Sequence, residues 1–127
     1  EAFLYKNCRN IESVKLPSTL KELWNNVFYD CENLKNIEIP KSVKFIGETS
    51  FCNCAFESIV VPGGVKYIEP GVFAGCKNLK RILYSGTKEQ LKDIEFGENI
   101  FDNCNKVSSI SCLNGVVDLN EYGEPMF

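Results

Sequence analysis

The stretch CENLKNIEIPKSVKFIGETSFCNC, residues 31–54, decides the fold, because its length and pattern recur along the chain. Five cysteines keep the phase of this repeat, at intervals of 23, 23, 22 and 28 residues: Cys8, Cys31, Cys54, Cys76 and Cys104. An aromatic residue stands three positions before each cysteine: Tyr5, Phe28, Phe51, Phe73 and Phe101. A repeat with a period in the twenties is typical of a solenoid, in which each coil is buried by stacking on its neighbours.

Within the repeat, the apolar residues Leu34, Ile37 and Ile39 are spaced as in a strand that is half-buried against a core. Pro40 follows, and because proline cannot donate to a sheet ladder it ends the strand. The sequence therefore predicts an α/β solenoid, with one short parallel strand per repeat of roughly 23 residues and short helical or turn segments on the other side.

The repeat unit reads L-x-x-I-x-I-P-x-x-V-x-x-I-x-x-x-x-F, and it resembles the unit of the BspA-like branch of the leucine-rich-repeat family. The match runs from Tyr5 to Ile110, and residues 84–94 resemble a stretch that often stands near the end of such arrays. One departure follows Cys54, where CAFESI is one residue shorter than C-x-x-L-x-x-I. Another is the residue before the phenylalanine, often Ala in the family, which is here Val27, Ser50 or Val72.

This resemblance implies a right-handed leucine-rich-repeat coil in a secreted or cell-surface protein of a bacterium or protist. By analogy with the cysteine ladders of this class, the five in-phase cysteines are expected to be buried thiols. Neighbouring coils lie about 5 Å apart, so oxidation of an adjacent pair remains an open alternative.

We expect a single leucine-rich-repeat domain over residues 1–127, with roughly four to five coils. Residues 84–103 are predicted to be an irregular insertion, because this coil is longer than the others and lacks the proline. Thr87 and Gln90 form a capping-box signal, which predicts a short helix over 88–94 with Leu91 and Ile94 facing inward.

The two ends of the array are predicted separately. Asn114-Gly115 is a two-residue hairpin signal, so a capping hairpin is expected over 110–119, where it covers the edge of the stack. Residues 120–127 are expected to form a loose tail, and Phe3 and Tyr5 to cover the opposite end of the core. The sequence begins in mid-repeat without Met, so we expect a fragment whose export signal and earlier coils are missing.

Composition argues against several classes of partner. The net charge is −3, from 14 basic and 17 acidic residues, and no basic stripe is present, so nucleic acid is not an expected partner. No apolar run is long enough to span a membrane, and no membrane insertion is expected in this fragment.

Catalysis and metal binding are not expected either. The chain has no histidine, which removes the commonest general base and every Ser/His or Cys/His arrangement. Without histidine a metal site would need thiolates alone, and the single residue between Cys52 and Cys54 is too tight for a zinc knuckle. The sequence therefore predicts a protein that is not an enzyme and has no cofactor or metal.

What remains is the open face of the strands, where the residues between the inward ones point outward. The candidate binding residues on this face are Lys15, Asn36, Glu38, Val60, Arg81 and Leu83. The row grades from charged to apolar, and Arg beside isolated apolar residues is a mixture found in protein-binding patches. Trp24 lies beyond the inward Leu23 and is expected to be partly exposed. Packing over a coil boundary is the preferred interpretation of this residue, and a ligand anchor is the alternative.

The predicted function is a protein-interaction module that adheres to host proteins or to other cell-surface proteins through the open strand face. One alternative is a structural spacer within a larger surface protein. A weaker alternative is a carbohydrate-binding module, which the lack of an aromatic platform on the strand face disfavours. The oligomeric state stays open.

Overall fold

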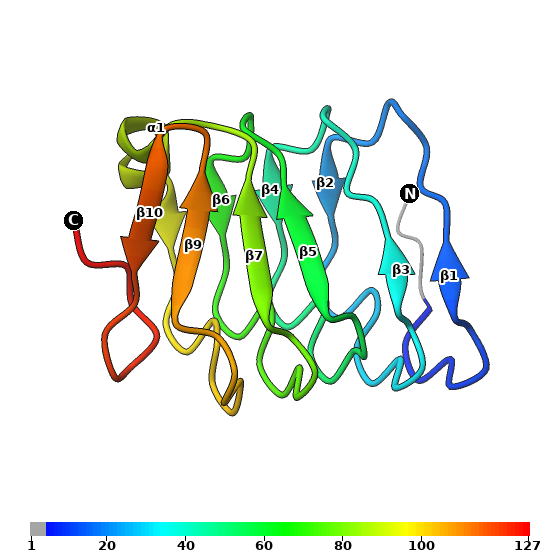
Figure 1. Cartoon of the computed structure of the whole chain (residues 1–127). Helices are drawn as coiled ribbons and strands as arrows, with labels where there is room; N and C mark the ends of the chain where they lie inside the picture. Colours follow the sequence, from blue (N-terminus) through cyan, green and yellow to red (C-terminus); the bar gives the residue numbers. More distant parts are fainter. Residues whose placement is uncertain (1–4) are drawn as a thin grey trace.

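The computed structural model describes residues 5–127, so the prediction for Phe3 lies outside the described residues. The chain forms a parallel β-solenoid in which each coil contributes one strand to a first sheet and one to a second, on the opposite side of the core (Figure 1). The strands on the first side, together called the first sheet, form two hydrogen-bonded groups. One contains β1 (Ser13–Val14) and β3 (Asn36–Ile37), and the other contains β5 (Ser58–Val61), β7 (Arg81–Tyr84), β9 (Ser109–Cys112) and β10 (Gly115–Asp118). The second sheet contains β2 (Glu22–Leu23), β4 (Phe45–Ile46), β6 (Tyr67–Ile68) and β8 (Glu95–Phe96).

The α/β class predicted from the sequence is wrong in its helical part. Among residues 5–127 the one helix is α1 (Lys88–Lys92), and the return path of each coil is a second short strand. Phe45 and Ile46 within this path favour a strand instead, since aromatic and β-branched residues fit a half-buried pleat.

The in-phase aromatic residues form a stack through the core. Ring centroids lie 5.5 Å apart between Phe28 and Phe51, and 5.8 Å apart both between Phe51 and Phe73 and between Phe73 and Phe101. Tyr5 continues the stack at 5.3 Å from Phe28, as predicted for the end of the core. These spacings are near the distance between neighbouring strands, so each coil contributes one ring to the stack.

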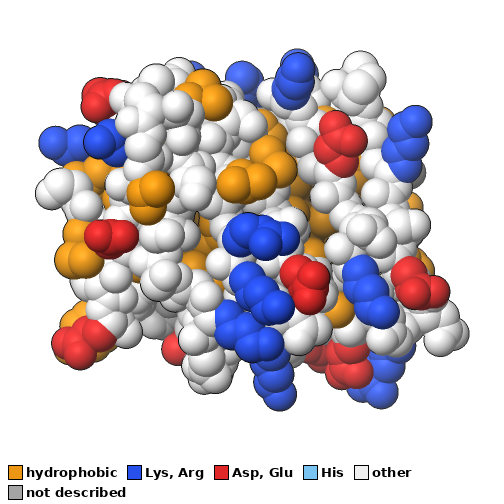
Figure 2. Space-filling model, in the orientation of Figure 1, with side chains coloured by type: hydrophobic (Ala, Val, Ile, Leu, Met, Phe, Trp, Pro, Cys, Tyr) orange, Lys and Arg blue, Asp and Glu red, His pale blue; other side chains and the backbone are white. Residues whose placement is uncertain are grey.

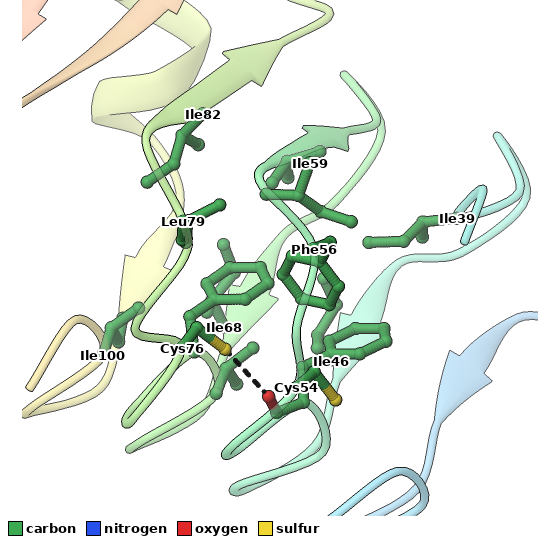
Figure 3. Close-up of a cluster of buried hydrophobic side chains, with 14 of the residues drawn as sticks. Ile39, Ile46, Cys54, Phe56, Ile59, Ile68, Cys76, Leu79, Ile82 and Ile100 are labelled. Atoms are coloured by element: carbon green, nitrogen blue, oxygen red, sulfur yellow. Dashed lines mark hydrogen bonds between the residues drawn. The ribbon is translucent and has the colours of Figure 1, made fainter. Parts of the chain in front are cut away.

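The in-phase cysteines form a second ladder beside the rings. All seven cysteines are free thiols, and four of the five in-phase residues are buried, whereas Cys8 is half-buried. Each buried thiol donates to the carbonyl of the aromatic residue one coil earlier, which already accepts from a backbone N–H of its own turn. The Sγ to O distances are 2.8 Å for Cys31 to Tyr5, 3.3 Å for Cys54 to Phe28, 3.1 Å for Cys76 to Phe51 (Figure 3) and 2.9 Å for Cys104 to Phe73. The repeat position thus calls for a small apolar side chain with a weak donor.

The fourth coil differs from the others because it contains the helix. The predicted capping box between Thr87 and Gln90 is present, and Leu91 and Ile94 are buried as expected. The helix ends at Lys92 instead of residue 94, and the return path is not lost, because β8 pairs with β6 and places Phe96 opposite Ile68.

The C-terminal end closes the first sheet. β10 pairs antiparallel with β9, and the turn is Leu113–Asn114, one residue earlier than the predicted Asn114-Gly115. Gly115 instead pairs with Cys112 as the first residue of β10, with a φ of 144°. The Asn114 side chain accepts from Lys88 N at 2.8 Å, which ties this turn to the helix.

The prediction of a loose tail is wrong. The Asn120 side chain accepts hydrogen bonds from the backbone of Tyr122 and Glu124, and Met126 N donates to Asp118 O at 2.8 Å. The tail therefore folds into a turn against the end of β10.

Candidate functional site

The first sheet presents the outward residues that the sequence analysis selected. In β5 and β7 exposed and buried residues alternate, so Val60 and Leu83 are exposed by 46% and 40%, while their neighbours Ile59 and Ile82 are buried. Val60 lies opposite Leu83, which makes a small apolar patch at the centre of the sheet.

A groove of about 1480 Å³ runs over the first four coils and brings most of the candidate residues together. Five of the six line it, from four different coils: Lys15, Asn36, Glu38, Val60 and Arg81. Leu83 does not line the groove and lies beside it, opposite Val60.

The groove lies over a break in the first sheet. β3 pairs with β1, and β5 pairs with β7, but among the described residues β3 and β5 do not pair with each other. The cause is the shortened segment after Cys54. Ala55 N still donates to Leu34 O at 2.9 Å. The next inward residue, Phe56, follows Cys54 by two positions, whereas Leu34 follows Cys31 by three, and its ring points into the core (Figure 3).

Phe56 holds this shortened path in place. It is buried, and its ring makes edge-to-face contacts with Phe51 and Phe73 at 5.8 and 6.2 Å. Such contacts fix the ring in the core, so β5 stays in register with β7 but does not pair with β3.

The lining of the groove is more basic than the chain as a whole. It contains four basic residues, Lys15, Lys35, Lys41 and Arg81, and two acidic residues, Glu38 and Glu57. Glu57 is paired at 3.8 Å with Lys80, which lies outside the groove. Figure 2 shows Lys and Arg side chains gathered in the lower centre of this face, with acidic side chains among them. A positive groove on a chain of net charge −3 favours ligands with negative charge.

Sequence reasoning missed part of the site. Lys35, Lys41 and Glu57 also line the groove, but they lie just outside the strands and the alternation rule does not select them. The short spacing after Cys54 was visible, and it is the signal that could have located the break.

A second surface, on the outer face of the second sheet, was also missed. Phe45 and Tyr67 lie opposite each other in β4 and β6, with ring centroids 6.0 Å apart, and Tyr67 is 41% exposed. Trp24, which follows β2, is 37% exposed, in agreement with the expected partial exposure.

The buried thiols are poor nucleophiles. Burial raises the pKa of the Cys54 and Cys76 thiols well above the ordinary value, and raises the pKa of Cys104 to about 11. Within residues 5–127 no three metal-ligating side chains come together, and no helix there has the length and apolar character to cross a bilayer.

Comparison with known proteins identifies the repeat. The sequence model of the family described as BspA type leucine rich repeat region matches residues 1–123, in 6 copies. Comparison with curated proteins gave no match.

Two solved structures resemble the chain. A leucine-rich repeat protein from Bacteroides ovatus ATCC 8483 is 25% identical, with a TM-score of 0.74, over 86% of this chain and 27% of that one. The T. pallidum leucine rich repeat protein is 28% identical, with a TM-score of 0.64, over 81% of this chain and 46% of that one. The chain therefore spans less than half the length of either structure.

Proposed function

Because the chain belongs to the BspA-type leucine-rich-repeat family, we propose that it acts in a surface or secreted protein and adheres to host or other cell-surface proteins. Leucine-rich repeats are generally protein-interaction modules, since stacked coils create extended concave surfaces. The adhesive surface in this proposal is the groove on the first sheet together with the adjoining Val60–Leu83 patch.

The observation that carries the proposal is the size and make-up of the groove. Its volume of about 1480 Å³ exceeds the roughly 300–1,000 Å³ of small-molecule sites, which favours a macromolecular ligand. Val60 supplies an apolar anchor beside Arg81, and arginine is enriched among the residues that dominate binding energy.

The test is binding of the chain to a panel of extracellular-matrix proteins and to whole cells, beside a strand-face variant with Glu38→Lys, Val60→Glu and Leu83→Glu. A matched control carries three changes of the same kind on the outer face of the second sheet: Glu22→Lys, Phe45→Glu and Tyr67→Glu. Circular dichroism checks that both variants are folded.

We expect saturable binding by the wild type and by the second-sheet control, and at least a ~10-fold loss, about 1.4 kcal/mol, in the strand-face variant. Equal binding by all three proteins would show that the strand face is not the site. In that case the alternative of a structural spacer within a larger surface protein gains support.

A further inference from the structure

The edge of β5 that faces β3 is open. Ser58 and Val60 hold the register positions of Arg81 and Leu83 in the next coil, where Arg81 N donates to Glu57 O at 3.2 Å. Ser58 N has no corresponding hydrogen bond to the backbone around β3 within the described residues, because the two strands do not pair. An unpaired strand edge is a template for another strand.

The opening cannot close by simple approach of the two coils, because the opposite side already holds them at the normal spacing. In the second sheet, Phe45 and Ile46 pair in register with Tyr67 and Ile68, and Lys66 N donates to Lys44 O at 2.8 Å. The break is therefore fixed by the missing residue after Cys54 and by the buried ring of Phe56.

We propose that an extended acidic segment of a partner protein lies in this groove and forms backbone hydrogen bonds with the free edge of β5. The inference rests on the proposed function, and it names the chemistry of the partner. Strand addition to an open sheet edge is a known mode of peptide recognition, in which the main chain gives affinity and alternate side chains give specificity.

Charge selects the acidic segment. Lys15, Lys35 and Arg81 line the groove without an ion-pair partner within 4.0 Å among the described residues, whereas Glu57 is partly compensated by Lys80. Alternate side chains of the bound strand would reach these cations on the open face, and the side chains between them would face the core, where the half-buried Ile37 lines the same groove. The segment therefore needs acidic and apolar residues in alternation.

The probe is a fluorescein-labelled nine-residue peptide that alternates Glu with Val and Thr, and the control peptide has Lys in place of every Glu. Fluorescence anisotropy measures binding to the wild type, to Ser58→Pro, which removes the free N–H, and to Ser58→Ala, which keeps it. Arg81→Glu tests the charge independently. Amide shifts in ¹⁵N spectra locate the contact.

We expect the acidic peptide to bind the wild type and Ser58→Ala, to shift the Ser58 and Val60 amides, and to bind Ser58→Pro and Arg81→Glu at least ~10-fold more weakly. The Lys peptide should not bind. Absence of binding by the acidic peptide, equal binding by Ser58→Pro, or shifts confined to the second sheet would overturn the inference.

The two proposals fail in different ways. If the acidic peptide does not bind, but the strand-face variant still loses adhesion to cells or matrix proteins, the adhesive face stands and the strand-addition inference fails. If the variant also keeps full adhesion, both fail.

Discussion

The two sheets of the solenoid come from the same coils, yet the second is continuous from β2 to β8 and the first is divided between β3 and β5. The missing residue lies on the first-sheet side of the third coil, directly after Cys54. On the other side of the same coil the rings, the thiols and the second sheet keep their register. In a solenoid each coil contacts only its nearest neighbours, so a deletion changes the structure locally. The first-sheet strands of two coils can therefore separate while their rings, thiols and second-sheet strands remain in contact.

The largest loss of stability should come from disrupting the ring stack, which keeps its register through all the coils. Phe51 is fully buried at the middle of the ring stack, next to the coil step where the first sheet is open. Phe51→Ala is expected to lower the free energy of unfolding by about 3–5 kcal/mol, measured by urea denaturation. The control is Tyr67→Ala on the outer face, which should cost about 1 kcal/mol. Similar losses in the two variants would contradict the role given to the ring stack.

A pair of proline substitutions compares the broken and intact parts of the first sheet at equivalent positions. Arg81→Pro removes the hydrogen bond from Arg81 N to Glu57 O and should cost about 3 kcal/mol of unfolding free energy. Ser58→Pro, at the same register position one coil earlier, removes no ladder bond and should cost less than about 1 kcal/mol. Both side chains are exposed, so the difference reports on the backbone, and equal costs would argue against an open edge at β5.

Alkaline pH should lower the free energy of unfolding through the buried thiols of the cysteine ladder. Burial raises the pKa of Cys54, Cys76 and Cys104, so above the unfolded-state pKa of about 8.5 the unfolded chain loses protons that the folded chain keeps. Stability should be constant up to about pH 8 and then fall by up to about 1.4 kcal/mol per pH unit for each buried thiol. Urea midpoints between pH 7 and 10 measure this slope, and Cys76→Ala should reduce it. The same slope in both proteins would exclude the thiols as its cause.

The smallest change in stability should come from one buried polar atom next to the ring stack. The Ser50 hydroxyl is fully buried and has no hydrogen-bond partner among the described residues, at the position before the phenylalanine where the family often has Ala. Ser50→Ala should raise the free energy of unfolding by about 1 kcal/mol, because it removes an unsatisfied buried group with little change in volume. Thermal unfolding is the measurement, and a lower melting temperature would show that the hydroxyl has a partner.

The repeat period of the sequence predicted those parts of the fold in which the same kind of residue occupies the same position of every repeat. The aromatic stack, the thiol ladder and the alternation around Ile59 and Ile82 all follow from side chains that must face a shared core. The family resemblance carried in the sequence is confirmed by the match over residues 1–123.

The second sheet could not be predicted in the same way. Strands of two residues, such as Phe45–Ile46, are too short to show a period, and their hydrogen bonds come only from the coils on either side. The break between β3 and β5 was missed for a related reason. The shortened spacing after Cys54 is visible in one coil, but its consequence depends on the register between two coils.

Native-state hydrogen exchange, resolved by residue in ¹⁵N spectra, tests the central claim most directly, because it reads the hydrogen bonding of each strand edge in the free protein. The account predicts that the Ser58 and Val60 amides exchange at least ~100-fold faster than those of Arg81 and Leu83, once rates are corrected for local sequence. The second-sheet amides should show no such step between β4 and β6. Equal protection of β5 and β7 would mean that the first sheet is continuous, and the open edge and the strand-addition inference would both be wrong.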